Sequence, residues 1–431
     1  MPNINELIKK HCPNGVEFKR LDEIGDFVRG SGLQKKDFVE NGVGCIHYGQ
    51  IYTYYGTFAT QTKSFVSEEK ARKFKKASCG NLVIAATSEN IGDLCKAVAW
   101  LGKENICISG DAFIYRHSQV PKYIAYLFQT QAFAKHKKRY VTGTKVFRVS
   151  ATDLGKFLIP VPPLPVQREI VRILDKFTKL EAELEAELEA RRKQYEYYRN
   201  ELLTFSECEN RGGGQIRRLV DLLRQHCPDG VKYVELGKIG DFVRGSGLQK
   251  KDFAETGVGC IHYGQIYTCY GTYATRTLSF VPPELAQKLR RIKYGDLVIA
   301  CTSENLKDLC KAVVWLGRDE IVTGGHACVF SHNQNPKYIA YFFQTSLFYE
   351  QKRKFAKGTK VIEIKASELA KIQIPLPSLA EQERIVAILD RFETLVNDLS
   401  VGLPAELAAR RRQYEYYRDR LLTFQPLEQK P

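Results

Sequence analysis

The feature that most constrains this chain is the duplication of a whole domain. The segment IGDFVRGSGLQKKDF at Ile24–Phe38 returns letter for letter at Ile239–Phe253, 215 residues later. Four further segments recur unchanged at the same shift, namely GVGCIHYGQIYT, TSEN, PKYIAY and GTKV, which begin at Gly42, Thr87, Pro121 and Gly143. A solenoid would instead show many short units. The 431 residues therefore predict two copies of one large domain.

Each copy predicts an α/β or α+β globule that ends near Leu158 and again near Ile374. The segments GCIHYGQIY, NLVIAAT and DAFIYRH are short, rich in β-branched and aromatic residues, and bounded by Gly, Asn or Asp, as strands are. The stretch PKYIAYLFQTQAFAKHKKR predicts one helix that leads to a Gly-Thr-Lys loop. A short helix closed by a Pro and Gly turn is expected to open each copy, at Ile4–His11 and Gln215–His226.

A helix of about 40 residues is expected after each globule, because apolar residues follow the proline-rich corner in steps of mostly three and four. The first helix is predicted over Val166–Phe205 and the second over Glu381–Phe424. A coiled-coil helix ~60 Å long cannot cover its own apolar stripe. Each helix therefore needs the other helix, another protein, or both, and an antiparallel pair across a pseudo-twofold axis is the favoured arrangement.

The two helices differ in length and continuity. Gln194 matches Gln413 at a shift of 219, so four residues are missing from the first copy after Phe177. Four helical residues correspond to ~6 Å of length and about 40° of rotation. The segment Gly402-Leu403-Pro404 should break the second helix and restart it at Ala405, whereas LEAELEAELEA in the first helix is unbroken.

The sequence thus predicts five consecutive segments. They are a globular domain, a long helix, a polar and glycine-rich linker, a second globular domain, and a second long helix broken near 402–404, at residues 1–160, 161–205, 206–214, 215–375 and 376–425.

The charge balance favours a polyanionic partner. Lys and Arg number 65 against 49 Asp and Glu, a net charge of +16, although charge alone does not distinguish a nucleic-acid binder from a merely basic protein. Neither a signal peptide nor a membrane span is expected, and the twelve cysteines show no metal-site spacing. They are interpreted as buried thiols of a cytoplasmic protein.

Several polar segments are typical of DNA recognition. The loop from Arg29 to Lys36 combines glycines with cationic side chains that suit phosphates, although a solvated turn would look similar. His47, Tyr48, Gln50 and Tyr52 could read base edges, or half of them could be sheet residues on an alternating strand.

Two further loops carry short polar or cationic groups. Ser88-Glu89-Asn90 follows an apolar strand, and Thr144-Lys145 follows a basic helix, where a phosphate clamp is expected. No motif for a methyl-donor cofactor, a flipped adenine, a nucleophile or a pair of catalytic carboxylates stands out in the sequence. The chain is therefore interpreted as a non-catalytic reader, with catalytic residues none and metal ligands none.

This combination resembles the specificity subunit of type I restriction-modification systems over essentially the whole chain. The resemblance is carried by CPNGVEF, RGSGLQKKDF, HYGQIY, the Gly-Thr-Lys loop, IPLPSLAEQERIVAILDRF and RRRQYEYYRDRLLTF. It implies two target-recognition domains that each read half of a split site on double-stranded DNA. It also implies that the helices bind two methyltransferase subunits, with restriction and translocase subunits joining them. S-adenosylmethionine, ATP and magnesium (Mg) are then expected on those partners and not on this chain.

The resemblance also implies roles for individual residues. Those expected to contact DNA are Arg29, Ser31, Lys35, Lys36, His47, Tyr48, Gln50, Tyr52, Ser88, Asn90, Thr144 and Lys145, with their counterparts Arg244, Ser246, Lys250, Lys251, His262, Tyr263, Gln265, Tyr267, Ser303, Asn305, Thr359 and Lys360. Those expected to contact partner subunits are Leu174, Leu184, Tyr195, Tyr198, Leu389, Leu399, Tyr414 and Tyr417.

The likeness of the two copies predicts a nearly palindromic target. The copies differ at possible contact positions, so that imperfect symmetry is expected; the pairs are Tyr54 and Cys269, Gln61 and Arg276, Gly92 and Lys307, Asp111 and His326, and Arg148 and Glu363. Two rival hypotheses remain at this stage. One is an enzyme whose motifs are not evident, and the other is a non-catalytic coiled-coil adaptor that binds only protein.

Overall fold

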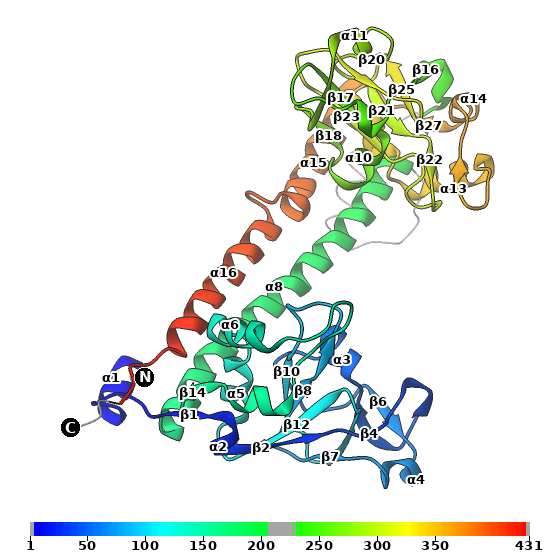
Figure 1. Cartoon of the computed structure of the whole chain (residues 1–431). Helices are drawn as coiled ribbons and strands as arrows, with labels where there is room; N and C mark the ends of the chain where they lie inside the picture. Colours follow the sequence, from blue (N-terminus) through cyan, green and yellow to red (C-terminus); the bar gives the residue numbers. More distant parts are fainter. Residues whose placement is uncertain (1–3, 206–226, 228–229, 428–431) are drawn as a thin grey trace. The chain divides into compact units, whose positions relative to one another are not determined.

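The computed structural model describes residues 4–205, 227 and 230–427, and the chain forms two compact units. Unit 1 comprises Met1–Glu185 with Glu406–Pro431, and unit 2 comprises Ala186–Ala405. Helix α8 (Leu164–Thr204) therefore begins in one unit and ends in the other (Figure 1). Each unit combines one copy of the repeated domain with helical segments from two parts of the sequence. The five consecutive segments predicted from the sequence do not show this exchange of helical segments between the units.

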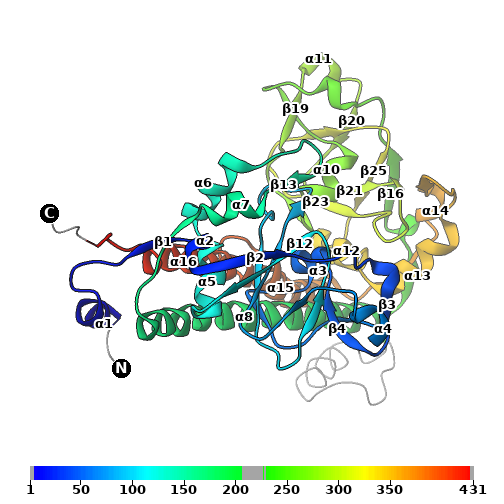
Figure 2. The ribbon, with the colours of Figure 1, turned by 60° about the horizontal axis from the view of Figure 1, so that its bottom comes forward.

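Two five-stranded sheets form the body of unit 1. The first has the order β2-β12-β8-β10-β5, with bounds Gly25–Arg29, Ala112–His117, Leu82–Ala85, Ala97–Trp100 and Phe58–Ala59. The second has the order β3-β6-β4-β11-β7, with bounds Phe38–Val39, Ser64–Val66, Val43–Ile46, Ile106–Ile108 and Lys76–Ala77. Strand β2 runs beside β12 at one edge of the first sheet (Figure 1; Figure 2).

Short strand pairs and helices complete unit 1. The pairs are β1 with β14 and β9 with β13, at Phe18–Arg20, Leu158–Pro160, Thr87–Ser88 and Phe147–Arg148. The helices before α8 are α1 to α7, at Ile4–His11, Leu21–Ile24, Tyr48–Thr53, Glu68–Ala71, Pro121–Leu127, Gln131–Tyr140 and Ala151–Gly155, and Lys35–Asp37 forms a 3-10 turn.

Unit 2 repeats this plan. Its sheets have the orders β16-β25-β21-β23-β18 and β19-β17-β24-β20, at Gly240–Arg244, Ala327–His332, Leu297–Ala300, Ala312–Trp315, Tyr273–Ala274, Ser279–Val281, Val258–Ile261, Ile321–Thr323 and Arg290–Ile292. Its strand pairs are β15 with β27 and β22 with β26, at Tyr233–Glu235, Gln373–Pro375, Thr302–Ser303 and Ile362–Glu363. Its helices are α10 to α15, at Tyr263–Thr268, Pro283–Ala286, Pro336–Phe342, Ser346–Phe355, Ala366–Leu369 and Leu379–Asn397, with 3-10 turns at Leu236–Lys238 and Lys250–Asp252.

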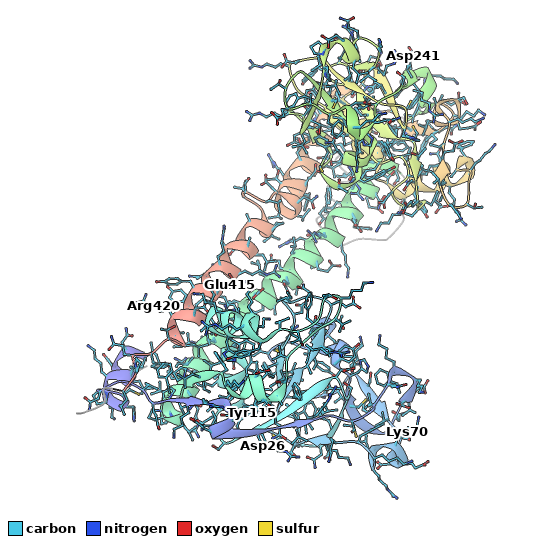
Figure 3. All side chains as sticks on the ribbon, viewed as in Figure 1. Asp26, Lys70, Tyr115, Asp241, Glu415 and Arg420 are labelled. Atoms are coloured by element: carbon cyan, nitrogen blue, oxygen red, sulfur yellow. The ribbon has the colours of Figure 1, made fainter. Side chains whose placement is uncertain are left out.

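The core explains why the strands predicted from NLVIAAT and DAFIYRH form. All four residues of β8 and the first four of β12 are buried, because alternate residues pack against α5 on one side of the sheet and against α3 and β11 on the other. Tyr115 of β12 lies in this core, and its hydroxyl donates to the Leu21 carbonyl at 2.8 Å (Figure 3). Eight of the described cysteines are buried free thiols, as the sequence predicts, whereas Cys79 and Cys269 are exposed.

An aspartate on the long helix binds a lysine and a tyrosine of the adjoining domain in each unit. Asp175 on α8 accepts from Lys122 Nζ at 2.7 Å and from the Tyr126 hydroxyl at 2.7 Å. Asp390 on α15 binds Lys337 and Tyr341 in the same way, at 2.7 and 2.6 Å. The repeated PKYIAY segment thus holds each domain on the long helix that follows it.

The antiparallel pairing expected for the helices is present within unit 1. Arg411 of α16 (Leu403–Leu421) donates to Glu181 of α8 at 2.6 Å and also binds Glu185. Further along α16, Tyr417 stacks on Phe177 with ring centroids 5.4 Å apart. Increasing numbers on α16 thus meet decreasing numbers on α8, which is the signature of antiparallel helices.

The second helix breaks earlier than the sequence predicts. Helix α15 ends at Asn397 and α16 begins at Leu403, so the expected restart at Ala405 is wrong by one half-turn. Asp398 causes the early end, because its carboxylate accepts from the backbone N–H groups of Ser400 and Val401 in place of a helical bond. Pro404 lies in the first turn of α16, where its missing N–H costs nothing.

Local hydrogen bonding overturns two other expectations. The segment HYGQIY is the helix α3 and not the end of a strand, because His47 Nδ1 accepts from Gly49 N–H and Gln50 Oε1 accepts from His47 N–H. The single helix predicted from PKYIAY onward is two helices, because Thr130 caps a new one. The opening helix of the first copy is α1, while its counterpart at 215–226 and the linker lie outside the described residues.

Candidate nucleic-acid interface

Three segments that are distant in the sequence meet around Arg29, at the end of β2. Arg29 Nε donates to the Gly110 carbonyl at 2.9 Å, and Arg29 Nη2 lies 3.8 Å from an Asp111 oxygen. The backbone N–H of Tyr48, in the first turn of α3, donates to Ser109 Oγ at 2.9 Å. The end of β2, the turn before β12 and the start of α3 therefore form one cluster, which we call the Arg29 cluster.

The loops TSEN and Gly-Thr-Lys are also neighbours. Strand β9 pairs antiparallel with β13, which places Phe147 opposite Ser88. Thr142 and Arg148 exchange backbone hydrogen bonds of 3.0 and 2.9 Å and so close a hairpin, with Gly143 at φ +97°. Thr144 and Lys145 form the exposed tip of this hairpin.

Helix α3 connects the hairpin to the Arg29 cluster. The Tyr52 hydroxyl at the C-terminal end of α3 donates to the Thr87 carbonyl of β9, and Ala86 N–H donates to the Asp111 carbonyl at 2.8 Å. The four loop groups that the sequence singles out are thus linked by hydrogen bonds within one domain.

The structure divides the predicted contact residues into two groups. Several already have partners inside the domain: Ser31 Oγ accepts from Lys75 N–H, Gln50 Nε2 donates to Ser64 Oγ, Ser88 Oγ accepts from Asn90 N–H, and His47 caps α3. These side chains shape the loops. Those with exposed side chains are Arg29, Lys35, Lys36, Asn90, Thr144 and Lys145, with Tyr48 half-buried. Among them, Arg29 and Asn90 also have hydrogen-bond partners inside the domain.

Unit 2 reproduces the arrangement at the counterpart residues. Arg244 Nε donates to the Gly325 carbonyl at 2.9 Å, and Lys357 and Glu363 close the second hairpin. His262, Gln265, Tyr267 and Ser303 have the internal partners of their counterparts, and Ser246 donates to the Lys288 carbonyl. Exposed here are Arg244, Lys250, Lys251, Asn305, Thr359 and Lys360, with Tyr263 half-buried.

The capping histidines report the electrostatics of the two clusters. Burial and the charge of Lys35 lower the pKa of His47, while Asp111 raises it. Burial and Lys250 lower the pKa of His262, and His326 lowers it further. Residues 111 and 326 therefore lie within electrostatic range of the same group in each copy.

Sequence reasoning missed the lysine that supports the TSEN loop. Lys137 is 7% exposed, and its Nζ donates to the carbonyls of Gly92 and Leu94 at 2.7 and 2.8 Å. Lys352 does the same in unit 2, with the carbonyls of Lys307 and Leu309. In the sequence Lys137 is one of several basic residues at a helix end, and no signal there separates it from the exposed Lys138.

Most of the residues predicted to contact partner subunits have buried side chains. Leu174, Leu389, Tyr195, Tyr198 and Tyr414 are buried, because the domain or the paired helix of the same unit covers them. Leu184 is half-buried and Tyr417 is 37% exposed. Leu399 is 83% exposed but lies in the turn between α15 and α16, so its predicted place on a helix is wrong.

The described residues contain neither a metal-binding cluster nor a membrane-spanning helix. No group of three or more His, Cys, Asp or Glu side chains is arranged to hold a metal ion there. No helix in those residues has the length and apolar character needed to cross a bilayer.

Comparison with known proteins matches both copies to one family. Residues 13–190 and 228–409 match the type I restriction modification DNA specificity domain. The chain is 31% identical over 314 residues to the EcoR124I/EcoR124II specificity subunit of Escherichia coli, covering 70% of each protein. It is 27% identical over 439 residues to a Haemophilus influenzae protein assigned as a type I restriction enzyme specificity subunit, covering 95% of this chain and 96% of that protein. A solved chain from a study of type I R-M complex assembly shares the fold, with a TM-score of 0.59, 17% identity, and coverage of 95% of this chain and 98% of that chain.

Proposed function

The chain belongs to the type I restriction modification DNA specificity family, and on that premise we propose that its Arg29 cluster and hairpin tip, with their counterparts in unit 2, contact the two halves of a split DNA sequence. Family membership makes the chain a non-catalytic specificity subunit with two target-recognition domains. The observation that carries the residue assignment is the assembly, in each unit, of exposed cationic and polar groups from four separate loops.

The exposed groups suit two kinds of contact. Lys145 and Lys360 stand at hairpin tips without a described partner, as a phosphate contact requires. Arg29 and Tyr48 are held at defined places by backbone hydrogen bonds. A guanidinium fixed in this way can reach a base edge in the major groove. Phosphate contacts then set the register, and the Arg29 cluster supplies sequence information.

The same backbone arrangement around Arg29 and Arg244 implies that the two domains read similar half-sites. A nearly palindromic split target follows if both domains present their Arg29-type clusters to DNA in the same way. The differences at residues that line the clusters would make the palindrome imperfect.

We propose that the spacer helices hold two methyltransferase subunits and that restriction and translocase subunits join them. The support is the surface of α16 that carries Glu415, Tyr416 and Arg420, where Tyr416 is 58% exposed (Figure 3 labels Glu415 and Arg420). Exposed tyrosines with mixed charges are typical of protein interfaces. S-adenosylmethionine would be bound by the methyltransferase, and ATP and magnesium by the restriction subunit. A cytoplasmic location is proposed because the DNA to be read lies there.

Salt-dependent DNA binding tests the assignment against a protein-only adaptor. The complex of the chain with its methyltransferase should bind duplex DNA with an affinity that falls steeply as salt rises, because phosphate contacts release counterions. Fluorescence anisotropy of a labelled duplex, with and without the chain, measures this. Binding that is independent of the chain would favour the adaptor.

A further inference from the structure

The two recognition clusters share one frame and differ at one central side chain. In both units the arginine Nε donates to the carbonyl that precedes the variable residue, at 2.9 Å. The variable residue itself, Asp111 or His326, accepts through its backbone carbonyl from Ala86 or Cys301, at 2.8 and 2.9 Å. Its Cα position is therefore fixed alike in the two domains, and only the side chain changes.

Asp111 offers acceptors only. Its carboxylate is 45% exposed and lies 3.8 Å from the guanidinium of Arg29, which is 68% exposed. A carboxylate can accept a hydrogen bond from the exocyclic amine of cytosine in the major groove. It also offsets the charge of Arg29, so that the first domain presents a neutral pair.

His326 offers a donor. Its ring lies 4.8 Å from that of Tyr263, and its Nδ1 is 3.3 Å from the Thr302 hydroxyl. When Thr302 donates to Nδ1, the ring proton stands on Nε2, which can donate to the O6 or N7 acceptor of guanine. His326 is exposed although both β24 before it and Ala327 after it are buried. Arg244 has no carboxylate at this position, so the second domain presents an uncompensated cation.

We propose that residues 111 and 326 make the two half-sites differ at one symmetry-related base pair, with Asp111 selecting cytosine and His326 selecting guanine on the contacted strand. This rests on the proposed function, because it assumes that the Arg29 cluster contacts DNA. It adds which residue makes the near-palindrome imperfect and in which direction.

The test is an exchange of the two side chains. Asp111→His, His326→Asp and the double variant are expressed with the partner methyltransferase, and methylated motifs are mapped at single-molecule level beside the wild type. Each single variant should make the motif symmetric at one position, and the double variant should exchange the two bases there. Methylation of the wild-type motif should fall by about tenfold or more for each single variant.

The conservative variant and a matched control isolate the effect. Asp111→Asn keeps the shape but adds a donor, so it should relax the preference at this one base pair. Ser118→Asn also introduces the unit 2 residue into unit 1, but directly after the opposite end of strand β12, and it should leave the motif unchanged.

Two outcomes would overturn the proposal: wild-type half-sites that are identical at every base, or exchange variants that methylate the wild-type motif at the wild-type rate. A wild-type chain that directs no motif at all would contradict the proposed function instead, which keeps the two failures distinguishable.

Discussion

The two recognition domains have kept the same structure, whereas the two spacer helices differ in length and continuity. Strands β2 and β12 pair in the same register as β16 and β25, and both hairpins have glycine at positive φ, at Gly143 and Gly358. By contrast, α8 is continuous over Leu164–Thr204, whereas α15 and α16 are separated by a turn. Packing against a closed core restricts the domains, while a periodic apolar stripe tolerates changes in whole helical turns.

The turn between α15 and α16 shows how a helix can be interrupted without a disordered loop. Gly402 lies so close to the end of α15 that a Cβ there would stand 2.4 Å from the Thr394 carbonyl oxygen. The turn exposes Leu399 and Val401, at 83% and 76%. In the corresponding part of α8, which is unbroken, Leu188 is buried. A continuous apolar stripe along the helix requires this burial.

The largest effect is expected from lengthening α8. Insertion of four residues after Leu184 adds ~6 Å and about 40° of helix. Methylation of the original motif should be lost, and a motif with the same half-sites and a longer unread spacer should replace it. Motif mapping measures this, and altered half-sites would show that helix and domains are not independent.

Replacing the buried lysine that supports the TSEN loop, Lys137 or Lys352, should destabilise its domain by a similar amount in each unit. Lys137→Met leaves the carbonyls of Gly92 and Leu94 without their ammonium donor, and Lys352→Met does the same in unit 2. We expect a loss of about 2–3 kcal/mol in the free energy of unfolding of the affected domain. Lys138→Met is the exposed control, and an equal loss there would refute the role of burial.

Acid should lower the free energy of unfolding of both domains through a buried histidine that occupies the same position in each. Burial lowers the pKa of His117 and His332 to about 4. The unfolded chain then binds more protons between about pH 6.5 and 4, so stability is fully present above pH 6.5 and is lost as the pH falls through that window. The loss by pH 4.5 should be about 2 kcal/mol per domain.

Urea unfolding at pH 7 and 4.5 measures this acid sensitivity. In the His117→Asn/His332→Asn variant an amide oxygen can accept the Gln119 and Gln334 N–H bonds in place of Nδ1. The acid loss should shrink in that variant, and an unchanged loss would assign it to other groups.

The smallest effect is expected at the hairpin tips. Lys145→Ala and Lys360→Ala should each reduce the slope of log affinity against log salt by about one, because one phosphate contact is lost. Lys19→Ala, on β1 beside Glu17, serves as the control with an unchanged slope. Slopes that differ between the two hairpin variants would show that the units do not contact DNA alike.

The sequence is sufficient to predict the duplication, because the repeated letters show it directly, and to predict the long helix and the Gly-Thr-Lys loops, because these depend on apolar periodicity or on glycine. It does not predict that each loop is the tip of a hairpin. It does not predict α3, since the aromatic and β-branched residues of HYGQIY favour a strand and only the caps at His47 and Gln50 favour a helix. Gln50 and Ser64 meet only through the fold, so the internal role of Gln50 could not be predicted. The same holds for the burial of Lys137.

The most direct test of the central claim is methylation mapping of DNA from cells that express this chain with its methyltransferase, beside cells that lack the chain. We expect one chain-dependent, split and nearly palindromic motif, with two half-sites separated by unread bases. A chain-dependent motif with a single contiguous site, or a motif that persists without the chain, would contradict it.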